Sequence, residues 1–111
     1  MKKPAKREVE WELAEGFKDS WKEYLELYPE IKPAMTEFDR CKRANPSKRL
    51  PAKMRDHKLD GPLSGFMDCH LANDVILIYK HRPKGVVRLY RVCQHADLKG
   101  PKARALAKLL R

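Results

Sequence analysis

Three runs of strand-like sequence follow one another between residues 64 and 93, and they limit the possible folds more than any other part of the chain. Residues 64–70 alternate between two faces, with Phe66, Asp68 and His70 on one and Met67 and Cys69 on the other. Residues 75–79 read Val-Ile-Leu-Ile-Tyr, and residues 86–93 form the third run. Alternation is typical of a strand with one buried face, whereas a continuous β-branched and aromatic run is typical of a central strand. Because the short connections between the runs can join only antiparallel neighbours, the sequence predicts an antiparallel meander.

The sequence before this meander predicts one strand and two helices. Residues 7–13 alternate between charged and apolar side chains, as in a half-buried strand. Residues 15–28 carry large apolar side chains at helical spacing, and Pro29 ends this helix. A second helix is expected to begin near Pro33, since proline is tolerated in a first turn, and to stop before Asn-Pro at residues 45–46.

Together these elements predict an α+β fold of two layers. The order is β-α-α-β-β-β, with an antiparallel sheet that has both helices packed on one face and its other face open. Residues 101–111 are rich in helix formers and basic side chains, so we expect a short C-terminal basic helix there. A chain of 111 residues has room for one domain, 1–111, with residues 1–6 as a flexible basic tail. Residues 45–63 are expected to form a long loop, and such loops are often functional.

The charge of the chain is concentrated in its last two-thirds. The formal net charge is +10. Residues 31–111 carry nineteen Lys and Arg and seven Asp and Glu, a net charge of +12, whereas residues 1–30 carry six and eight, a net charge of −2. Clustered positive charge indicates a polyanion partner, first of all a nucleic acid. A basic solubilising surface and a face that docks an acidic protein are the alternatives.

The same composition excludes several other classes of protein. No run of 18 apolar residues exists, and the basic N-terminus leads into Glu8-Val9-Glu10 instead of an apolar segment, so we expect neither a membrane span nor a secretory signal. The cysteines Cys41, Cys69 and Cys93 are odd in number and far apart, which argues against disulfides and a cysteine zinc site. We expect Cys69 and Cys93 to be buried strand residues, and a cytoplasmic location for the chain.

Histidines are the candidates for chemistry. His57, His70 and His95 each lie near a carboxylate in the sequence, whereas His81 lies in a basic turn and is expected to be exposed. Two histidines can act as general base and general acid in one reaction, and RNA cleavage by its own 2′-hydroxyl needs that pair together with a cation. Scattered structural histidines and a zinc site are the alternatives; the spacing lacks the helical i, i+4 pair of many zinc sites.

One part of the sequence is specific enough to indicate a family. Residues 55–61 read Arg-Asp-His-Lys-Leu-Asp-Gly, and residues 65–80 read Gly-Phe-Met-Asp-Cys-His-Leu-Ala-Asn-Asp-Val-Ile-Leu-Ile-Tyr-Lys. Arg91 then precedes His95-Ala96. This pattern closely resembles the YafQ branch of the RelE/ParE superfamily of bacterial toxins. The resemblance covers residues 50–98, and the strand–helix–helix order before it fits the same fold.

The resemblance implies a toxin of a type II toxin–antitoxin system. Such a toxin is a ribosome-dependent mRNA endonuclease, or mRNA interferase, that a cognate antitoxin neutralises, and it needs no metal or other cofactor. We expect His95 to be the general acid and Asp74 or His70 the general base. His57 would position the RNA or help in proton transfer, and Arg91 would stabilise the phosphorane. The basic side chains expected to bind RNA are Lys53, Arg55, Lys58, Lys80, Arg82 and Lys99.

The chain departs from the family pattern at two positions. Val75 stands where close members place a tryptophan, and Lys99 stands where they place a phenylalanine. An aromatic side chain stacks on a base and contributes about 1–3 kcal/mol, which neither residue can supply. Two alternatives therefore stay open: a toxin of the ParE type that inhibits gyrase or the ribosome by binding alone, and an RNA-binding homologue with impaired catalysis.

Overall fold

The computed structural model describes residues 9–44 and 47–110, so the predicted tail at residues 1–6 lies outside the described residues. The strands and α-helices follow the order predicted from the sequence, with two additions, a short strand in the long loop and four single-turn 3₁₀ helices. The elements are β1 (Glu10–Leu13), α1 (Phe17–Leu27), α2 (Ile31–Arg43), η1 (Ala52–Met54), β2 (His57–Lys58), η2 (Gly61–Leu63), β3 (Met67–Ala72), β4 (Val75–Arg82), η3 (Pro83–Gly85), β5 (Val86–Cys93), η4 (His95–Leu98) and α3 (Gly100–Leu110).

The sheet has the order β1-β5-β4-β3-β2. The antiparallel meander of β3, β4 and β5 confirms the prediction. The expectation of a wholly antiparallel sheet is wrong, because β1 pairs with β5 in parallel. Parallel pairing needs a long connection between the two strands, and most of the chain lies between β1 and β5. The predicted long loop also contributes β2, which pairs with β3 in an antiparallel arrangement.

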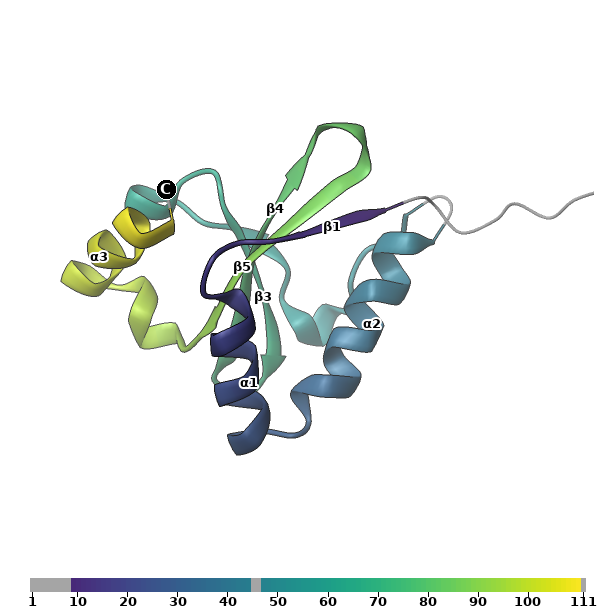
Figure 1. Cartoon of the computed structure of the whole chain (residues 1–111), viewed down its shortest axis with the longest axis horizontal. Coiled ribbons are helices and arrows are strands. Elements are labelled where there is room, and N and C mark those ends of the chain that lie inside the picture. The colour runs from purple at the N-terminus through teal and green to yellow at the C-terminus, as the bar shows by residue number, and fades with distance from the viewer. Residues whose placement is uncertain (1–8, 45–46, 111) are drawn as a thin grey trace, which may run out of the picture.

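Helices α1 and α2 pack on one face of the sheet, as predicted (Figure 1). Their core includes Phe38 and Cys41 of α2, Leu77 and Tyr79 of β4, and Val92 of β5. Helix α2 begins at Ile31, two residues before the expected start at Pro33, because the fully buried Ile31 side chain extends its apolar face.

The other face of the sheet is not open, and this expectation is wrong. Helix α3 lies on the side of the sheet opposite α2 (Figure 1), and its residues Ala103, Leu106 and Ala107 are buried in a second core with Leu63 and Phe66. The reason is the apolar stripe of α3, whose spacing matches one helix face and which removes further apolar surface from water.

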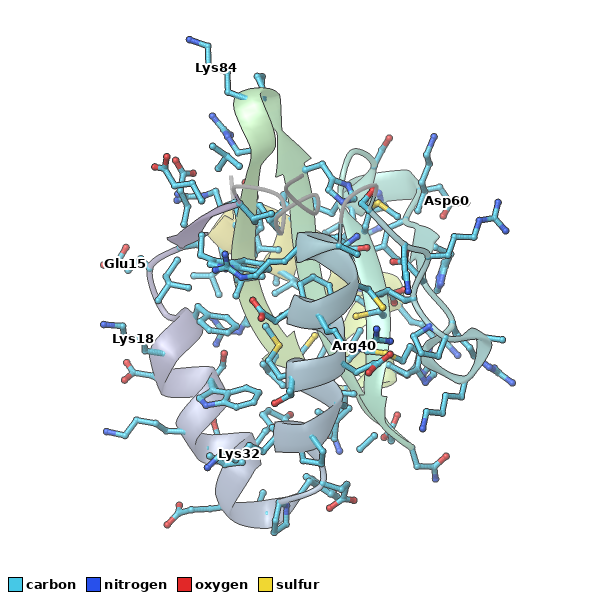
Figure 2. The ribbon with its side chains drawn as sticks, turned by 90° about the vertical axis from the view of Figure 1, so that its right-hand side faces the viewer. Glu15, Lys18, Lys32, Arg40, Asp60 and Lys84 are labelled. Carbon is cyan, nitrogen blue, oxygen red and sulfur yellow. The ribbon has the colours of Figure 1, made fainter. Side chains whose placement is uncertain are left out.

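The β4–β5 hairpin extends β4 to Arg82, beyond the predicted run at residues 75–79. Lys84 lies at the tip of this hairpin, away from both cores (Figure 2). Its φ of 65° lies in the left-handed region that side-chain-bearing residues avoid. None of the helices within residues 9–44 and 47–110 combines the length and the apolar character needed to cross a membrane.

Candidate active site

Two of the predicted histidines meet where the meander ends. Register pairs His70 of β3 with Ile76 of β4, and Ile76 with Cys93 of β5. Directly paired residues point to the same face. His70, Ile76 and Cys93 therefore form one row across the sheet, and His70 lies level with the end of β5. His95 follows two residues later as the first residue of η4, and the two imidazole rings lie 4.7 Å apart between centroids at an angle of 65°.

The surroundings of His70 favour a neutral ring. Burial lowers the pKa of His70 below its usual value of 6.5, and the neighbouring His95 and Arg55 lower that pKa further. At neutral pH the His70 imidazole is therefore uncharged and can accept a proton.

Asp74 holds His95 in place. It lies in the turn between β3 and β4, and its Oδ1 accepts a hydrogen bond of 3.3 Å from the backbone N–H of His95. The same oxygen lies 3.8 Å from Nδ1 of the ring. Asp97, the carboxylate nearest to His95 in the sequence, instead accepts the backbone N–H of Gln94 at 3.0 Å and closes the turn of η4.

His57 also pairs with a carboxylate that is not its sequence neighbour. The β2–β3 register places it opposite Asp68, and His57 Nδ1 lies 2.9 Å from Asp68 Oδ1 and 2.8 Å from the carbonyl oxygen of Arg55. Both neighbours of Nδ1 are acceptors, so Nδ1 carries a proton and the lone pair of the neutral ring lies on Nε2. Sequence reasoning did not assign a role to Asp68; its place two residues before His70 was the available signal.

Asp68 is fully buried, and apart from its ion-pair contact with His57 neither of its carboxylate oxygens has a hydrogen-bond partner among the residues that the structure describes. Burial raises the pKa of Asp68, and the nearby His57 counteracts that rise in pKa. A buried carboxylate is costly unless a charge faces it. The His57 ring, 2.9 Å away, is the polar group that faces this buried carboxylate.

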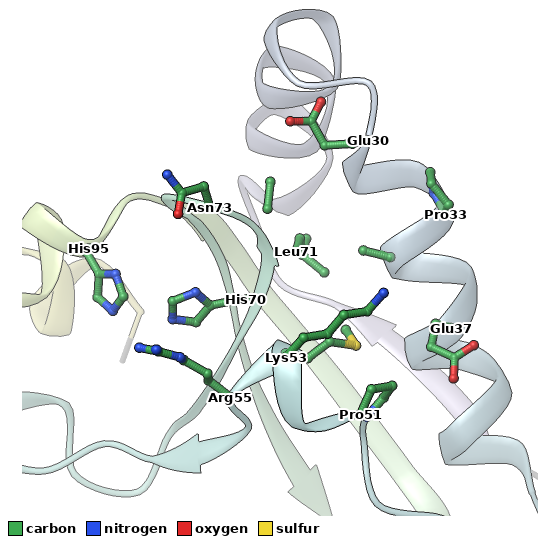
Figure 3. A pocket seen from close by; sticks show the side chains of 13 residues that line it. Glu30, Pro33, Glu37, Pro51, Lys53, Arg55, His70, Leu71, Asn73 and His95 are labelled. Atoms are coloured by element: carbon green, nitrogen blue, oxygen red, sulfur yellow. The ribbon is translucent and has the colours of Figure 1, made fainter.

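Arg55 supplies a cation beside His70 and His95, although the sequence predicted only RNA binding for it. It follows η1 with φ 47° and ψ 50°, a left-handed conformation that is rare for residues other than glycine and that clusters at functional sites. Its guanidinium points toward the rings of His70 and His95 (Figure 3).

A cavity of about 730 Å³ joins these groups to α2. Lys53, Arg55, His70 and His95 line one part of it, and the opposite part is lined by Glu30, just before α2, and by the α2 residues Pro33, Ala34 and Glu37 (Figure 3). That volume is ordinary for a ligand-binding cleft. Of the other predicted RNA-binding residues, Lys58, Lys80, Arg82 and Lys99 do not line this cavity.

Of the predicted catalytic residues, His70 and His95 line this cavity, His57 and Asp74 line neither it nor the second cavity, and Arg91 lines the second. It lines a hollow of about 360 Å³ between α1, β5 and α3, together with Glu23 and Asp97. A regular strand continued through residue 95 would place Arg91 and His95 on one face. Strand β5 instead ends at Cys93 and His95 begins η4, so the alternation of the strand does not extend to His95.

The cysteines are buried, as expected for Cys69 and Cys93. Burial raises the pKa of the Cys93 thiol to about 12 and raises that of Cys69 still further. Neither thiol is ionised at neutral pH, and neither is a nucleophile.

The comparison with known families decides what kind of protein this is. A family model described as a bacterial toxin of a type II toxin–antitoxin system, YafQ, matches residues 9–100. The chain belongs to this YafQ family. The family match ends where α3 begins, so α3 is an addition to the matched region.

Two curated relatives carry the same family name. The mRNA interferase toxin YafQ of Escherichia coli is 45% identical over 51 residues, which is 46% of this chain and 54% of that protein. A putative toxin YafQ of Haemophilus influenzae is 44% identical over 32 residues, 29% of this chain and 31% of that protein. In these alignments the chain spans about half, or less, of the length of the curated relatives.

Solved YafQ structures extend the similarity to the whole fold. The crystal structure of YafQ from Escherichia coli has a TM-score of 0.64 at 28% identity, over 84% of this chain and 100% of that chain. The Escherichia coli DinJ–YafQ complex has a TM-score of 0.63 at 29% identity with the same coverage. The predicted RelE-like α+β fold is therefore confirmed.

The two departures from the YafQ pattern have different structural settings. Val75 is fully buried among the core residues that α1 and α2 cover, so it offers no surface to a base. Lys99 is exposed between η4 and α3 and is accessible to a ligand.

Proposed function

We propose that this chain is the toxin of a type II toxin–antitoxin system and that it cuts mRNA on the ribosome. The observation that carries this proposal is the contact of His70 with His95 beside Arg55 in an open cavity of a strongly basic chain. Membership of the YafQ family supports the toxin role, and a similar protein is named an mRNA interferase toxin.

The groups of the site support cleavage by general acid–base catalysis without a metal. His70, neutral at pH 7, accepts the proton of the ribose 2′-hydroxyl as that oxygen attacks phosphorus. His95 donates a proton to the leaving 5′-oxygen as the phosphorus–oxygen bond breaks. The products are a 2′,3′-cyclic phosphate and a 5′-hydroxyl. Asp74 lies against His95, which favours His70 over Asp74 as the base.

We assign the stabilisation of the phosphorane to Arg55, with His57 beside it. The guanidinium of Arg55 points toward both rings (Figure 3), whereas Arg91 lines the second cavity. A preformed cation at the position where charge develops contributes most to such a step. Comparing Arg55→Gln with Arg91→Gln tests this assignment: the first should lower the cleavage rate much more than the second.

The partners follow from the charge and the family. A net charge of +10 favours RNA on the ribosome and an acidic antitoxin as binding partners. Two similar structures are complexes of YafQ with DinJ, one of them named a toxin–antitoxin complex. We infer a cognate antitoxin for this chain and a cytoplasmic site of action.

Expression of the chain without a partner in growing bacteria tests the proposed function. Wild type should arrest translation and leave mRNA fragments that end in a 2′,3′-cyclic phosphate. His95→Gln should abolish both effects, and Lys84→Gln at the hairpin tip should keep them. Arrest by His95→Gln at the wild-type rate would defeat the catalytic role.

A role by binding alone is the second candidate, because neither Val75 nor Lys99 can stack on a base. It predicts arrest without cleaved mRNA, and DNA damage where the target is gyrase. Normal growth during expression would instead favour an RNA-binding homologue with impaired catalysis.

A further inference from the structure

A polar chain runs behind the active site, on the α2 side of the sheet. Lys42 of α2 is only 7% exposed, and its Nζ lies 2.9 Å from Nε2 of His81 and 3.4 Å from the hydroxyl of Tyr79. The Tyr79 hydroxyl in turn contacts a carboxylate oxygen of Asp56. This chain joins the C-terminal part of α2, strand β4 and the segment between η1 and β2.

The direction of each hydrogen bond in the Lys42–Tyr79–Asp56 chain is fixed by its members. A lysine ammonium has donors only, so the Tyr79 oxygen accepts and the Tyr79 O–H donates to Asp56. Burial and the contact with Asp56 raise the pKa of Tyr79, so its proton is retained. A cation and an anion thus stand at the two ends of one hydroxyl, which makes both bonds charge-assisted.

Stability alone does not account for this arrangement. Replacing a buried ionic group by an apolar side chain of similar volume is often neutral or stabilising. Here the ammonium of Lys42 is enclosed by the rings of Phe38, at 5.3 Å, and Tyr79, at 4.8 Å. Phe38 also packs edge-on against Tyr79, with ring centroids 4.9 Å apart, and so fixes the direction of the hydroxyl.

The far end of the chain is attached to the active site. Asp56 stands between Arg55 and His57, the two site residues that this segment contributes. The segment is otherwise held by the two-residue pairing of β2 with β3 and by the contact of His57 with Asp68, while the side chains of Arg55 and His57 are exposed. Asp56 belongs to the Asp-His pair of the family pattern and Tyr79 to its Ile-Leu-Ile-Tyr-Lys run, and the fold joins them.

We propose that Tyr79, held by Lys42, is a positioning residue that orients the Arg55–His57 segment for RNA cleavage through Asp56. This inference rests on the proposed function. In this proposal, buried side chains beneath the site hold the Arg55 guanidinium and the His57 imidazole in the positions from which they face the phosphate.

Tyr79→Phe in the full chain is the direct test, with Tyr90→Phe as the matched control. Tyr90 is a buried tyrosine of the neighbouring strand, and no side-chain hydrogen bond joins its hydroxyl to a residue that the structure describes. The single-turnover rate constant for cleavage of ribosome-bound mRNA should fall about tenfold to a hundredfold in Tyr79→Phe. The affinity for the ribosomal complex should stay within about twofold of wild type, and Tyr90→Phe should keep the wild-type rate.

Asp56→Ala gives a second route that does not alter the core, since Asp56 is exposed. It should lower the rate as much as Tyr79→Phe, and the double variant should lose no more than either single one, because all three break the same contact. Asp60→Ala, an exposed aspartate in the same loop, serves as control. Additive losses, or a fall in affinity with an unchanged rate constant, would overturn the proposal.

A readout without RNA separates this inference from the proposed function. Nitrogen-15 NMR of His57 in the free chain should show the proton on Nδ1 in wild type, and averaging between tautomers in Tyr79→Phe and Asp56→Ala. An inactive wild type with this NMR response would refute the nuclease and keep the positioning contact. An unchanged His57 spectrum in both variants would refute the positioning contact.

Discussion

Arg55 has a backbone conformation that most residues avoid, and its strain can be measured apart from its side chain. The left-handed region at φ 47° costs an ordinary residue about 1–2 kcal/mol. Glycine avoids that cost but loses about 0.5–1 kcal/mol more backbone entropy than alanine on folding. Arg55→Gly should therefore be more stable than Arg55→Ala by about 0.5–1 kcal/mol in urea unfolding.

Cleavage should respond to the same two variants in a different way. Both remove the guanidinium that points toward His70 and His95, so both should lower the cleavage rate constant by about 10²–10³. The glycine variant would thus be more stable than the alanine variant and equally inactive. This outcome would show that the chain accepts strain at Arg55 in order to place its side chain.

Lys84 provides the matched control, because it has the same left-handed backbone at a hairpin tip outside the site. Lys84→Gly should exceed Lys84→Ala in stability by a similar amount, with wild-type cleavage in both. Equal stability of the two Arg55 variants, beside a clear difference at Lys84, would refute the strain argument. Wild-type cleavage by Arg55→Ala would refute the role of the guanidinium.

Three further changes have defined outcomes. Since the pKa of His70 lies below 6.5 in the folded chain, the unfolded chain binds more protons as pH falls. The stability that His70 contributes should be complete above pH 6.5 and lost as pH falls through the folded pKa; urea unfolding of wild type and His70→Gln between pH 5 and 8 would show it. Leu106→Ala in α3 should cost about 2–5 kcal/mol of unfolding free energy, whereas Leu109→Ala, 63% exposed, should change it little. Lys99→Phe should tighten binding to ribosome-bound mRNA by about 1–3 kcal/mol, while Val75→Trp should destabilise the fold because Val75 is fully buried.

The meander could be predicted from the sequence because side-chain periodicity and short connections depend only on residues that are close together in the chain. Strand β5 was predicted at its observed bounds, whereas the sequence left open whether His70 and His95 lie on the same face. The parallel pairing of β1 with β5 could not be predicted in this way, because no short connection constrains two strands that lie far apart in the chain. The sequence also does not show which of two faces an amphipathic helix such as α3 will cover.

The charged partners of the histidines were the least predictable part of the site. Two of the imidazoles stand beside a carboxylate that is close in space and not adjacent in sequence: Asp68 for His57 and Asp74 for His95. The adjacent carboxylates have other tasks, since Asp56 contacts Tyr79 and Asp97 closes η4. Which carboxylate lies beside which imidazole depends on the strand register, and the register depends on the folded sheet as a whole.

The second core links the parts of the site that the sheet alone does not hold. Helix α3 packs against both η2 and η4, the single turns that follow His57 and begin with His95. Apolar contacts of Leu106 with this core therefore connect two exposed segments that each carry one imidazole. Because local opening follows the stability of such contacts, loss of α3 packing should loosen the geometry of His57 and His95 before it unfolds the meander of β3, β4 and β5.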